Sequence, residues 1–342
     1  MNSHNDFQWI KAVLLGCAMQ LNPMTLWAQS PNTTTVRVYG DLDVGVGRVH
    51  FPGLSASTWQ TSGFDAQSYF GIAGSEALGG DWAAQFKLES YISLDNGVAA
   101  NTFYPTDPFW GRSATVGLKS GRWGALNLGR NPNPFYQGAV AHNAFGESFL
   151  SPALTVASFR QGHVVGRAHD NGIRYDSPVI GGFSFSALLG LKEAASNGND
   201  HSATLAYAQG PWAGVVGTAT VKTGLAEGKK SSIGFYAASY DFGVLRLFAE
   251  AATQRDTEAE VKSRAFDLGA KVPLGPWTLK VSSARIKQTD LAGGQARTER
   301  VTSLGGEYLV SKRTKLYGGV KYDKVTDLDA AKSVIVGLRH SF

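Results

Sequence analysis

Hydrophobic and polar residues alternate along most of the chain. In one segment every second residue from Trp82 through Leu88 is apolar, and the polar residues Gln85 and Lys87 stand between them. Successive side chains of a strand point to opposite faces, so such a segment can turn one face to lipid and the other to water. The repeating segments are about as long as a tilted transmembrane strand of about 9–11 residues. A soluble β-sandwich alternates in the same way, so the pattern alone leaves both architectures open.

The connections between these segments alternate between short and long. Short ones lie at residues 76–80, 120–122, 177–182, 209–211, 241–243, 273–276 and 311–313. Counting strands around these seven short turns and the eight long loops between them gives sixteen strands, from near Val36 to Phe342. Short turns on one side and long loops on the other are typical of an outer-membrane barrel. We therefore predict an all-β fold, a sixteen-stranded antiparallel transmembrane β-barrel.

The positions of tryptophan support this prediction. Four of the short turns are followed at once by a tryptophan, namely Trp82, Trp123, Trp212 and Trp277. In a barrel these residues fall at one membrane interface, where an amphipathic ring is best accommodated. They predict one half of an aromatic girdle.

Composition narrows the class of protein. Glycine makes up 41 of the 342 residues, 17% of the residues are charged and 11% are aromatic. The aromatic content argues against disorder. The glycine content argues against a helical enzyme, because a glycine inside a helix costs about 1 kcal/mol relative to alanine. The net charge of +5 is spread along the chain rather than gathered in a run, so no nucleic-acid partner is expected.

The first 28 residues have the features of a secretory signal peptide. An apolar stretch follows Lys11 and ends at Ala28, before Gln29, as at a signal-peptide cleavage site. An ordinary N-terminal helix is the alternative. Removal of residues 1–28 would take away Cys17, the only cysteine. Residues 29–342 are then expected to form a single barrel domain without disulfides or cysteine-bound metal.

Candidate catalytic residues are present but form no recognised motif. His142, Glu147 and Ser151 lie in the longest connection, and the sequence contains no nucleophile elbow and no His-Glu-x-x-His pattern. His163 and His169 are six residues apart, which is not a helical metal-binding spacing. We therefore expect no enzyme, no metal and no other cofactor. A barrel hydrolase and a surface adhesin with a plugged lumen remain as alternatives.

Closure of the barrel has a consequence for function. Hydrocarbon offers no hydrogen-bond partner, so every strand must be paired on both sides. The interior of a sixteen-stranded barrel is too wide for the side chains of its wall to fill, which leaves an aqueous channel. We expect passive diffusion of small hydrophilic solutes and ions.

Several segments resemble Gram-negative general porins of the neisserial and betaproteobacterial type. They are Val36–Asp43, Phe70–Gly80, Arg112–Leu118, Asn171–Pro178, Ser311–Tyr317 and Val336–Phe342. The resemblance implies export through the periplasm to the outer membrane, contact with its lipid, and a homotrimer with one pore in each barrel. The terminal Phe342 resembles the signal that the barrel assembly machinery recognises. Tyr69 stands where many relatives carry an arginine.

The resemblance also implies a pore constriction. In the family the third long loop folds inward, and here that loop would be residues 131–169. In the family, acidic residues of this loop face basic residues of the barrel wall. The carboxylates near this loop are Glu147 and Asp170, and the basic residues are Arg160 and Arg167. Because excess positive charge in a narrow opening attracts anions, we predict a preference for anions.

Alternation indicates which wall residues reach the lumen. Arg37, Lys87 and Arg174 point inward if their apolar neighbours face lipid. Arg130 has the parity of lipid-facing leucines, so it reaches the lumen only if Gly129 breaks the strand. These residues complete the expected constriction.

Overall fold

The computed structural model describes residues 34–101, 107–153, 166–192, 198–222, 225–294 and 296–342, which include seventeen strands and helix α2 (Pro134–Ala141). The predicted signal peptide lies outside the described residues. The strands are β1 (Thr35–Val49), β2 (Ser57–Ser62), β3 (Tyr69–Gly79), β4 (Trp82–Tyr91), β5 (Ser113–Ser120), β6 (Gly124–Pro132), β7 (Ala168–Asp176), β8 (Phe183–Gly190), β9 (Asp200–Gln209), β10 (Trp212–Val221), β11 (Ser231–Asp241), β12 (Arg246–Asp256), β13 (Val261–Leu274), β14 (Trp277–Asp290), β15 (Ala296–Leu309), β16 (Thr314–Val325) and β17 (Ala331–Ser341).

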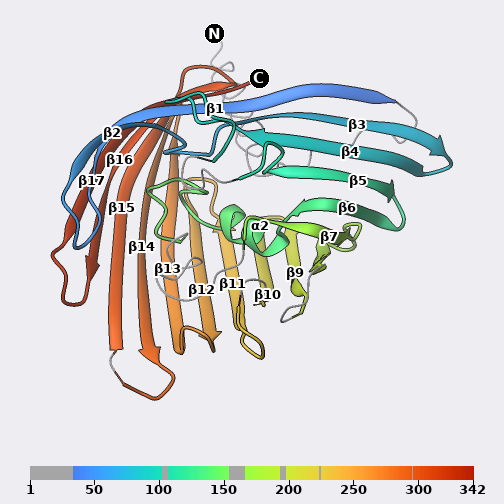
Figure 1. The fold of residues 1–342 in the computed structure, drawn as a ribbon. Helices are drawn as coiled ribbons and strands as arrows, with labels where there is room; N and C mark the ends of the chain where they lie inside the picture. The colour runs from blue at the N-terminus through green and yellow to red at the C-terminus, as the bar shows by residue number, and fades with distance from the viewer. Residues whose placement is uncertain (1–33, 102–106, 154–165, 193–197, 223–224, 295) are drawn as a thin grey trace, which may run out of the picture.

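The strands form one closed antiparallel barrel (Figure 1). β1 pairs with β17 from Asp41 opposite Ser341 to Arg48 opposite Val334. The other edge of β1 pairs with β3 along its first half and with β2 along its second half. Since β2 and β3 share one place in the ring, the seventeen strands occupy sixteen positions. The predicted sixteen-stranded transmembrane β-barrel is confirmed.

The break between β2 and β3 brings residues into the barrel interior. Gly63 has a φ of +83°, a left-handed conformation that glycine adopts readily. The chain leaves the sheet there and returns at Tyr69. Phe64 and Asp65, which lie in this break, are both buried.

The seven short connections lie at or beside the predicted positions, although β3 continues to Gly79, so that its turn is residues 80–81 rather than 76–80. The four tryptophans beside them are between 41% and 58% exposed. Two of these rings lie against tyrosines of the next strand: Trp212 is 4.5 Å from Tyr240 and Trp277 is 4.7 Å from Tyr308, measured between ring centroids. These residues form an aromatic belt at the short-turn end of the barrel.

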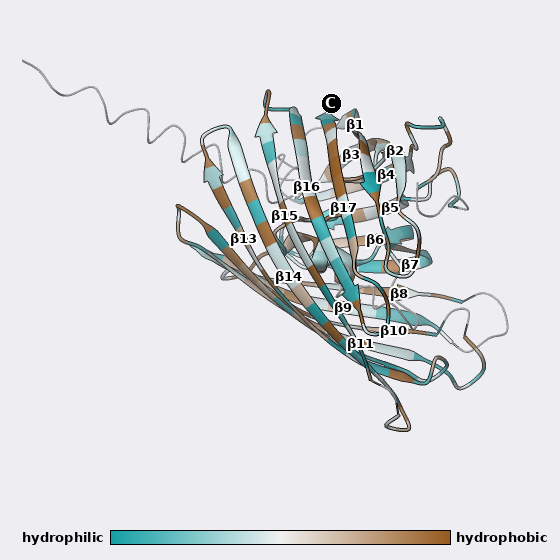
Figure 2. Ribbon diagram, turned by 90° about the vertical axis from the view of Figure 1, so that its left-hand side faces the viewer, coloured by the Kyte–Doolittle hydropathy of each residue, from teal (hydrophilic) through white to brown (hydrophobic). Residues whose placement is uncertain are grey.

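The two faces of the wall have opposite chemistry. Leu268 of β13 and Leu304 of β15 are more than half exposed, whereas the adjacent Asp267 and Ser303 are buried. Figure 2 shows this alternation of hydrophobic and hydrophilic residues along the strands. An apolar outer face and a polar inner face are what a membrane barrel requires. Among the described residues, no helix is long and apolar enough to cross a membrane.

The segment between β6 and β7 packs against distant strands. The side chain of Asn133 accepts a hydrogen bond from the backbone of Phe135 and caps α2. The Phe135 ring lies 5.4 Å from that of Phe235 on β11. Farther along, Leu150 reaches Gly319 of β16, where a β-carbon would lie 2.6 Å from its methyl group. This glycine provides the room in which the segment packs.

Candidate functional site

Charged side chains of the inner wall form the candidate site. Arg37 lies on the face opposite the exposed Val36 and Val38, with its guanidinium 5.0 Å from the centre of the Tyr39 ring. Lys87 has the same orientation on β4, and its amine is 3.7 Å from the Glu89 carboxylate. The inner-face positions predicted for Arg37 and Lys87 agree with this geometry.

Arg112, which the sequence analysis does not single out, adds a cation beside Glu89. Its guanidinium is 3.3 Å from that carboxylate and stacks 4.0 Å from the centre of the Tyr69 ring. Arg112 brings a positive charge beside Tyr69 from the residue that precedes β5. Sequence alternation gives no signal for this residue, because it precedes β5.

Arg174 also lies on the predicted face, but its guanidinium holds the long segment. It binds Asp176 and donates hydrogen bonds of 2.6 Å to the Pro132 carbonyl and 2.8 Å to the Gln137 side chain. Hydrogen bonds from a charged donor are stronger than neutral ones. Arg174 therefore links β7 to the segment that contains α2.

Arg130 follows a bulge in its strand. The register of β6 against β7 shifts between Gly129 and Asn131, and Gly129 has a φ of +117°. The strand break that the sequence analysis requires is therefore present. The guanidinium donates to the Gly111 carbonyl at 2.6 Å and to Asp170 at 2.6 Å.

Glu147 and Arg167 both contact the side chain of Tyr136. The Tyr136 hydroxyl donates to Glu147 at 3.5 Å, and the Arg167 guanidinium lies 5.5 Å from the centre of the Tyr136 ring. Burial, followed by the nearby Glu147 charge, raises the pKa of Tyr136. Arg160 lies outside the described residues.

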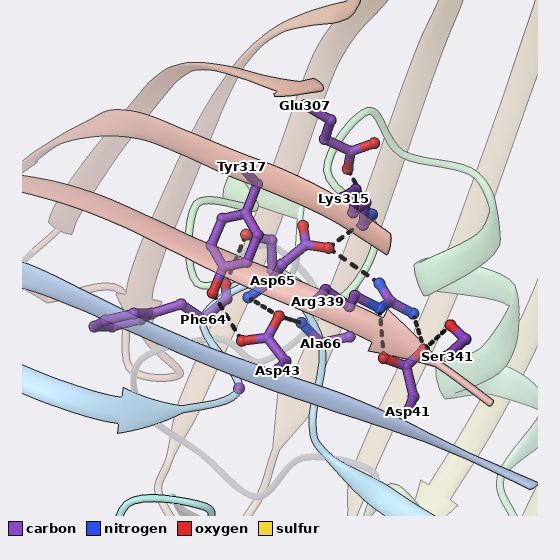
Figure 3. Close-up of polar contacts among 12 residues, drawn as sticks. Asp41, Asp43, Phe64, Asp65, Ala66, Glu307, Lys315, Tyr317, Arg339 and Ser341 are labelled. Atoms are coloured by element: carbon purple, nitrogen blue, oxygen red, sulfur yellow. Dashed lines mark hydrogen bonds and ion pairs between the residues drawn. The ribbon is translucent and has the colours of Figure 1, made fainter. Parts of the chain in front are cut away.

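Side chains of alternating charge lie in a row on the inner wall near the β1–β17 seam (Figure 3). We call this set the ion-pair network, and it consists of Lys280, Glu307, Lys315, Asp65, Arg339 and Asp41. The Lys315 amine is 2.8 Å from Asp65 and 2.9 Å from Glu307. Burial opposes ionisation of Asp65, but Lys315, Lys280 and Arg339 together hold its pKa below the usual range. Each cation in this network contacts a carboxylate.

Two further cations face each other without such a partner. Arg246 and Lys271 are directly opposite across β12 and β13, and Lys271 is in turn opposite Lys280. We call these three residues the basic row. Within the described part of the chain, neither Arg246 nor Lys271 forms an ion pair. Both flank the Phe248 ring, at 5.4 Å and 5.3 Å from its centre. Lys271 lies in the alternating segment of β13, so alternation could have identified it.

An acidic pair lies on the same two strands but is withdrawn from water. Glu250 and Asp267 are directly opposite each other. Their exposed fractions are 1% and 0%, whereas Arg246 and Lys271 are partly exposed. Asp267 accepts a hydrogen bond of 2.6 Å from Ser282. The exposed Asp241 of β11 lies opposite Arg246, whereas Lys271 has a cation opposite it on both neighbouring strands.

Comparison with known proteins identifies the family. Residues 23–328 match the family model described as Gram-negative porin. The chain is 29% identical to outer membrane porin protein 32 of Delftia acidovorans, over 90% of this chain and 94% of the relative. The predicted resemblance to porins is confirmed.

Two solved structures share the fold. The anion-selective porin from Comamonas acidovorans superposes with a TM-score of 0.78 at 26% identity, covering 91% of this chain and all of the other. The trimer form of OmpT from Vibrio cholerae has a TM-score of 0.71 at 16% identity, with 91% of this chain and all of the other covered. Porins are outer-membrane channels and not enzymes, so the hydrolase and adhesin alternatives are not favoured. The chain belongs to the Gram-negative porin family.

Proposed function

We propose that this porin is a passive channel that prefers anions among small hydrophilic solutes and ions. The observation that carries the proposal is the basic row, where Arg246, Lys271 and Lys280 lie opposite one another on the inner face and Lys271 forms no ion pair among the described residues. The nearest acidic pair is fully buried. Cations lining a narrow water-filled path raise the local concentration of anions. The similar Comamonas porin is named anion-selective, which supports the proposal.

The narrow part of the path is proposed to be residues 131–169. Arg174 binds this segment from β7, and Phe135 packs on β11. Figure 1 draws α2 within the ring of strands. These contacts support a fixed constriction. Arg37, Lys87, Arg130, Glu147, Arg160, Arg167 and Arg174 are its proposed charged residues.

The assembly is proposed to be a homotrimer in outer-membrane lipid. The trimer form of the Vibrio cholerae outer membrane protein OmpT supports this oligomeric state. At the chain end, Phe342 and Gly40 exchange backbone hydrogen bonds of 3.1 Å and 3.3 Å, which places the terminal residue at the closing seam. Phe342 is 44% exposed there, and it is proposed to be the signal for the barrel assembly machinery. Residues 1–28 are proposed to be the signal peptide.

Planar-bilayer recording tests the ion preference. Purified protein is inserted into a neutral bilayer with a tenfold potassium chloride gradient, and the reversal potential is measured. We expect the sign given by anion flux, and a potential of the cation sign would reject the proposal. Lys87→Glu is expected to shift the potential toward cations, because its amine lies on the inner wall.

A further inference from the structure

Six basic side chains gather on the outer face of the barrel. We call them the outer basic patch, and they are Arg255 of β12, Lys262 and Arg264 of β13, Arg285 and Lys287 of β14, and Arg300 of β15. All six are exposed. Along β13, Arg264 shares its face with the exposed Phe266 and Leu268. The patch therefore belongs to the lipid-facing side of the wall.

Strand register places these cations next to one another. Arg255 is directly opposite Lys262, Arg264 is opposite Lys287, and Arg285 is opposite Arg300. Side chains directly opposite in an antiparallel pair have β-carbons about 4.5–5.5 Å apart, and like charges there are destabilising. Three such pairs lie on four adjacent strands.

The chain supplies no counter-charge for the patch among its described residues. None of the six side chains takes part in an ion pair or a side-chain hydrogen bond there. Acidic residues of the same strands have the opposite parity: Asp256, Asp267 and Glu299 are buried on the inner face. Within the described residues, no acidic side chain offsets the repulsion in the patch.

The height of the patch on the wall indicates what that ligand is. Ten residues of β13 separate Leu274, at the short turn, from Arg264. At about 3.4 Å per residue and a tilt of about 40°, this corresponds to about 26 Å along the membrane normal. The apolar band of an outer-membrane barrel is about 25 Å tall, with its long loops on the cell surface. The patch thus begins where the lipid headgroups of the outward leaflet lie.

Hydroxyl groups adjoin the cations. Ser283 and Thr302 are directly opposite one another just beneath Arg285 and Arg300, and their hydroxyls are 2.8 Å apart. Beside Arg255, a shallow hollow of about 320 Å³ is lined by residues that include Thr218, Ser232, Gly234 and Thr253. Guanidinium groups bind phosphate through two parallel hydrogen bonds. Hydroxyls suit the sugar or glycerol part of a headgroup.

We infer that the outer basic patch binds the phosphorylated headgroup of a lipid in the outward leaflet. The inference rests on the outer-membrane porin fold and its orientation, and it does not depend on the ion preference of the pore. Such a lipid would neutralise the opposed cations and would lie against Phe266 and Leu268 with its acyl chains.

The test compares two variants of the full chain with equal charge changes. The patch variant carries Arg264→Gln, Arg285→Gln and Lys287→Gln. The control variant carries Arg122→Gln, Lys312→Gln and Arg313→Gln, which remove three exposed cations at the short-turn end. Each protein is purified in a neutral detergent and titrated with lipid A bearing both phosphates or with the same lipid after dephosphorylation. Bound lipid is measured by native mass spectrometry.

The parent chain and the control variant are expected to bind phosphorylated lipid at least about tenfold more tightly than the patch variant. Equal binding by the patch variant, or equal binding of the dephosphorylated lipid by the parent, would overturn the inference. The inference would also fail if inorganic phosphate at equal concentration displaced the lipid. It would fail as well if the patch bound only a second copy of the chain.

Two further measurements separate folding and pore function from lipid binding. Circular dichroism checks that each variant forms the β-barrel. The reversal potential of the patch variant should equal that of the parent, because the six side chains face outward. If all channels were cation-preferring while lipid binding followed the expected order, the proposed ion preference would fail and the lipid site would stand.

Discussion

The cations of the ion-pair network and those of the outer basic patch lie on some of the same strands, but their surroundings differ. Strand β14 carries members of both, with Lys280 on its inner face and Arg285 and Lys287 on its outer face. Lys280 contacts Glu307, whereas neither Arg285 nor Lys287 pairs with a described carboxylate. The inner-face cations of the network stabilise the wall through ion pairs. The outer-face cations have no such partner among the described residues, and a lipid phosphate is inferred to neutralise them.

The basic row combines features of both groups. Arg246 and Lys271 face inward like the network, but neither forms an ion pair among the described residues, although Asp241 lies opposite Arg246. The counter-ion of the row is therefore expected to come from solution, as a permeating anion. The comparison separates three roles for basic residues: joining strands, attracting solutes and binding lipid.

Breaking the ion-pair network should have the largest effect on stability. Asp65→Asn removes the carboxylate between Lys315 and Arg339, which lie 2.8 Å and 3.0 Å from it. Lys315 and Arg339 keep Glu307 and Asp41 as partners, so the expected cost is that of lost hydrogen bonds to charged groups, about 1.5–3 kcal/mol each. Guanidinium unfolding of the micelle-bound protein, followed by circular dichroism, measures this loss.

Asp170→Asn is the matched control for Asp65→Asn. Its carboxylate also binds an arginine, Arg130, but its side chain is 69% exposed. An exposed ion pair contributes about 0–1 kcal/mol. If the two variants lost equal stability, the network would not be the element that holds the β1–β17 seam.

Reversing one charge of the basic row should change selectivity. Lys271→Glu alters the charge by two units, and at about 8 Å in water this shifts the energies of anions and cations by about 1 kcal/mol in opposite directions. The ratio of anion to cation permeability should fall by more than about tenfold at low salt and by less at high salt. Reversal potentials at both salt concentrations measure it.

Lys262→Glu makes the same charge change on the outer face of the same strand, β13. It should leave the permeability ratio unchanged. Equal shifts in Lys262→Glu and Lys271→Glu would show that the total charge of the barrel, rather than its inner wall, controls the ions.

The sequence predicts which face of the wall a residue lies on better than it predicts which side chains contact one another. Period-two alternation is enough to predict a face for Arg37, Lys87 and Arg174, because a regular strand leaves only two faces. It does not predict that Asp65 meets Arg339, which is 274 positions away. That contact depends on the break between β2 and β3 and on closure of the ring, and neither is a local property of the sequence.

Relieving repulsion in the outer basic patch should have the smallest effect, and its sign should depend on lipid. Arg285→Gln removes the like-charge contact with Arg300, and opposed like charges cost up to about 1 kcal/mol. In a neutral detergent without added lipid, this variant should therefore be more stable than the parent by about 0.2–1 kcal/mol. With phosphorylated lipid A present, the parent gains binding energy that the variant has partly lost, and the order should reverse. Guanidinium unfolding under the two conditions measures both values. The same order under both conditions would mean that lipid does not neutralise this pair.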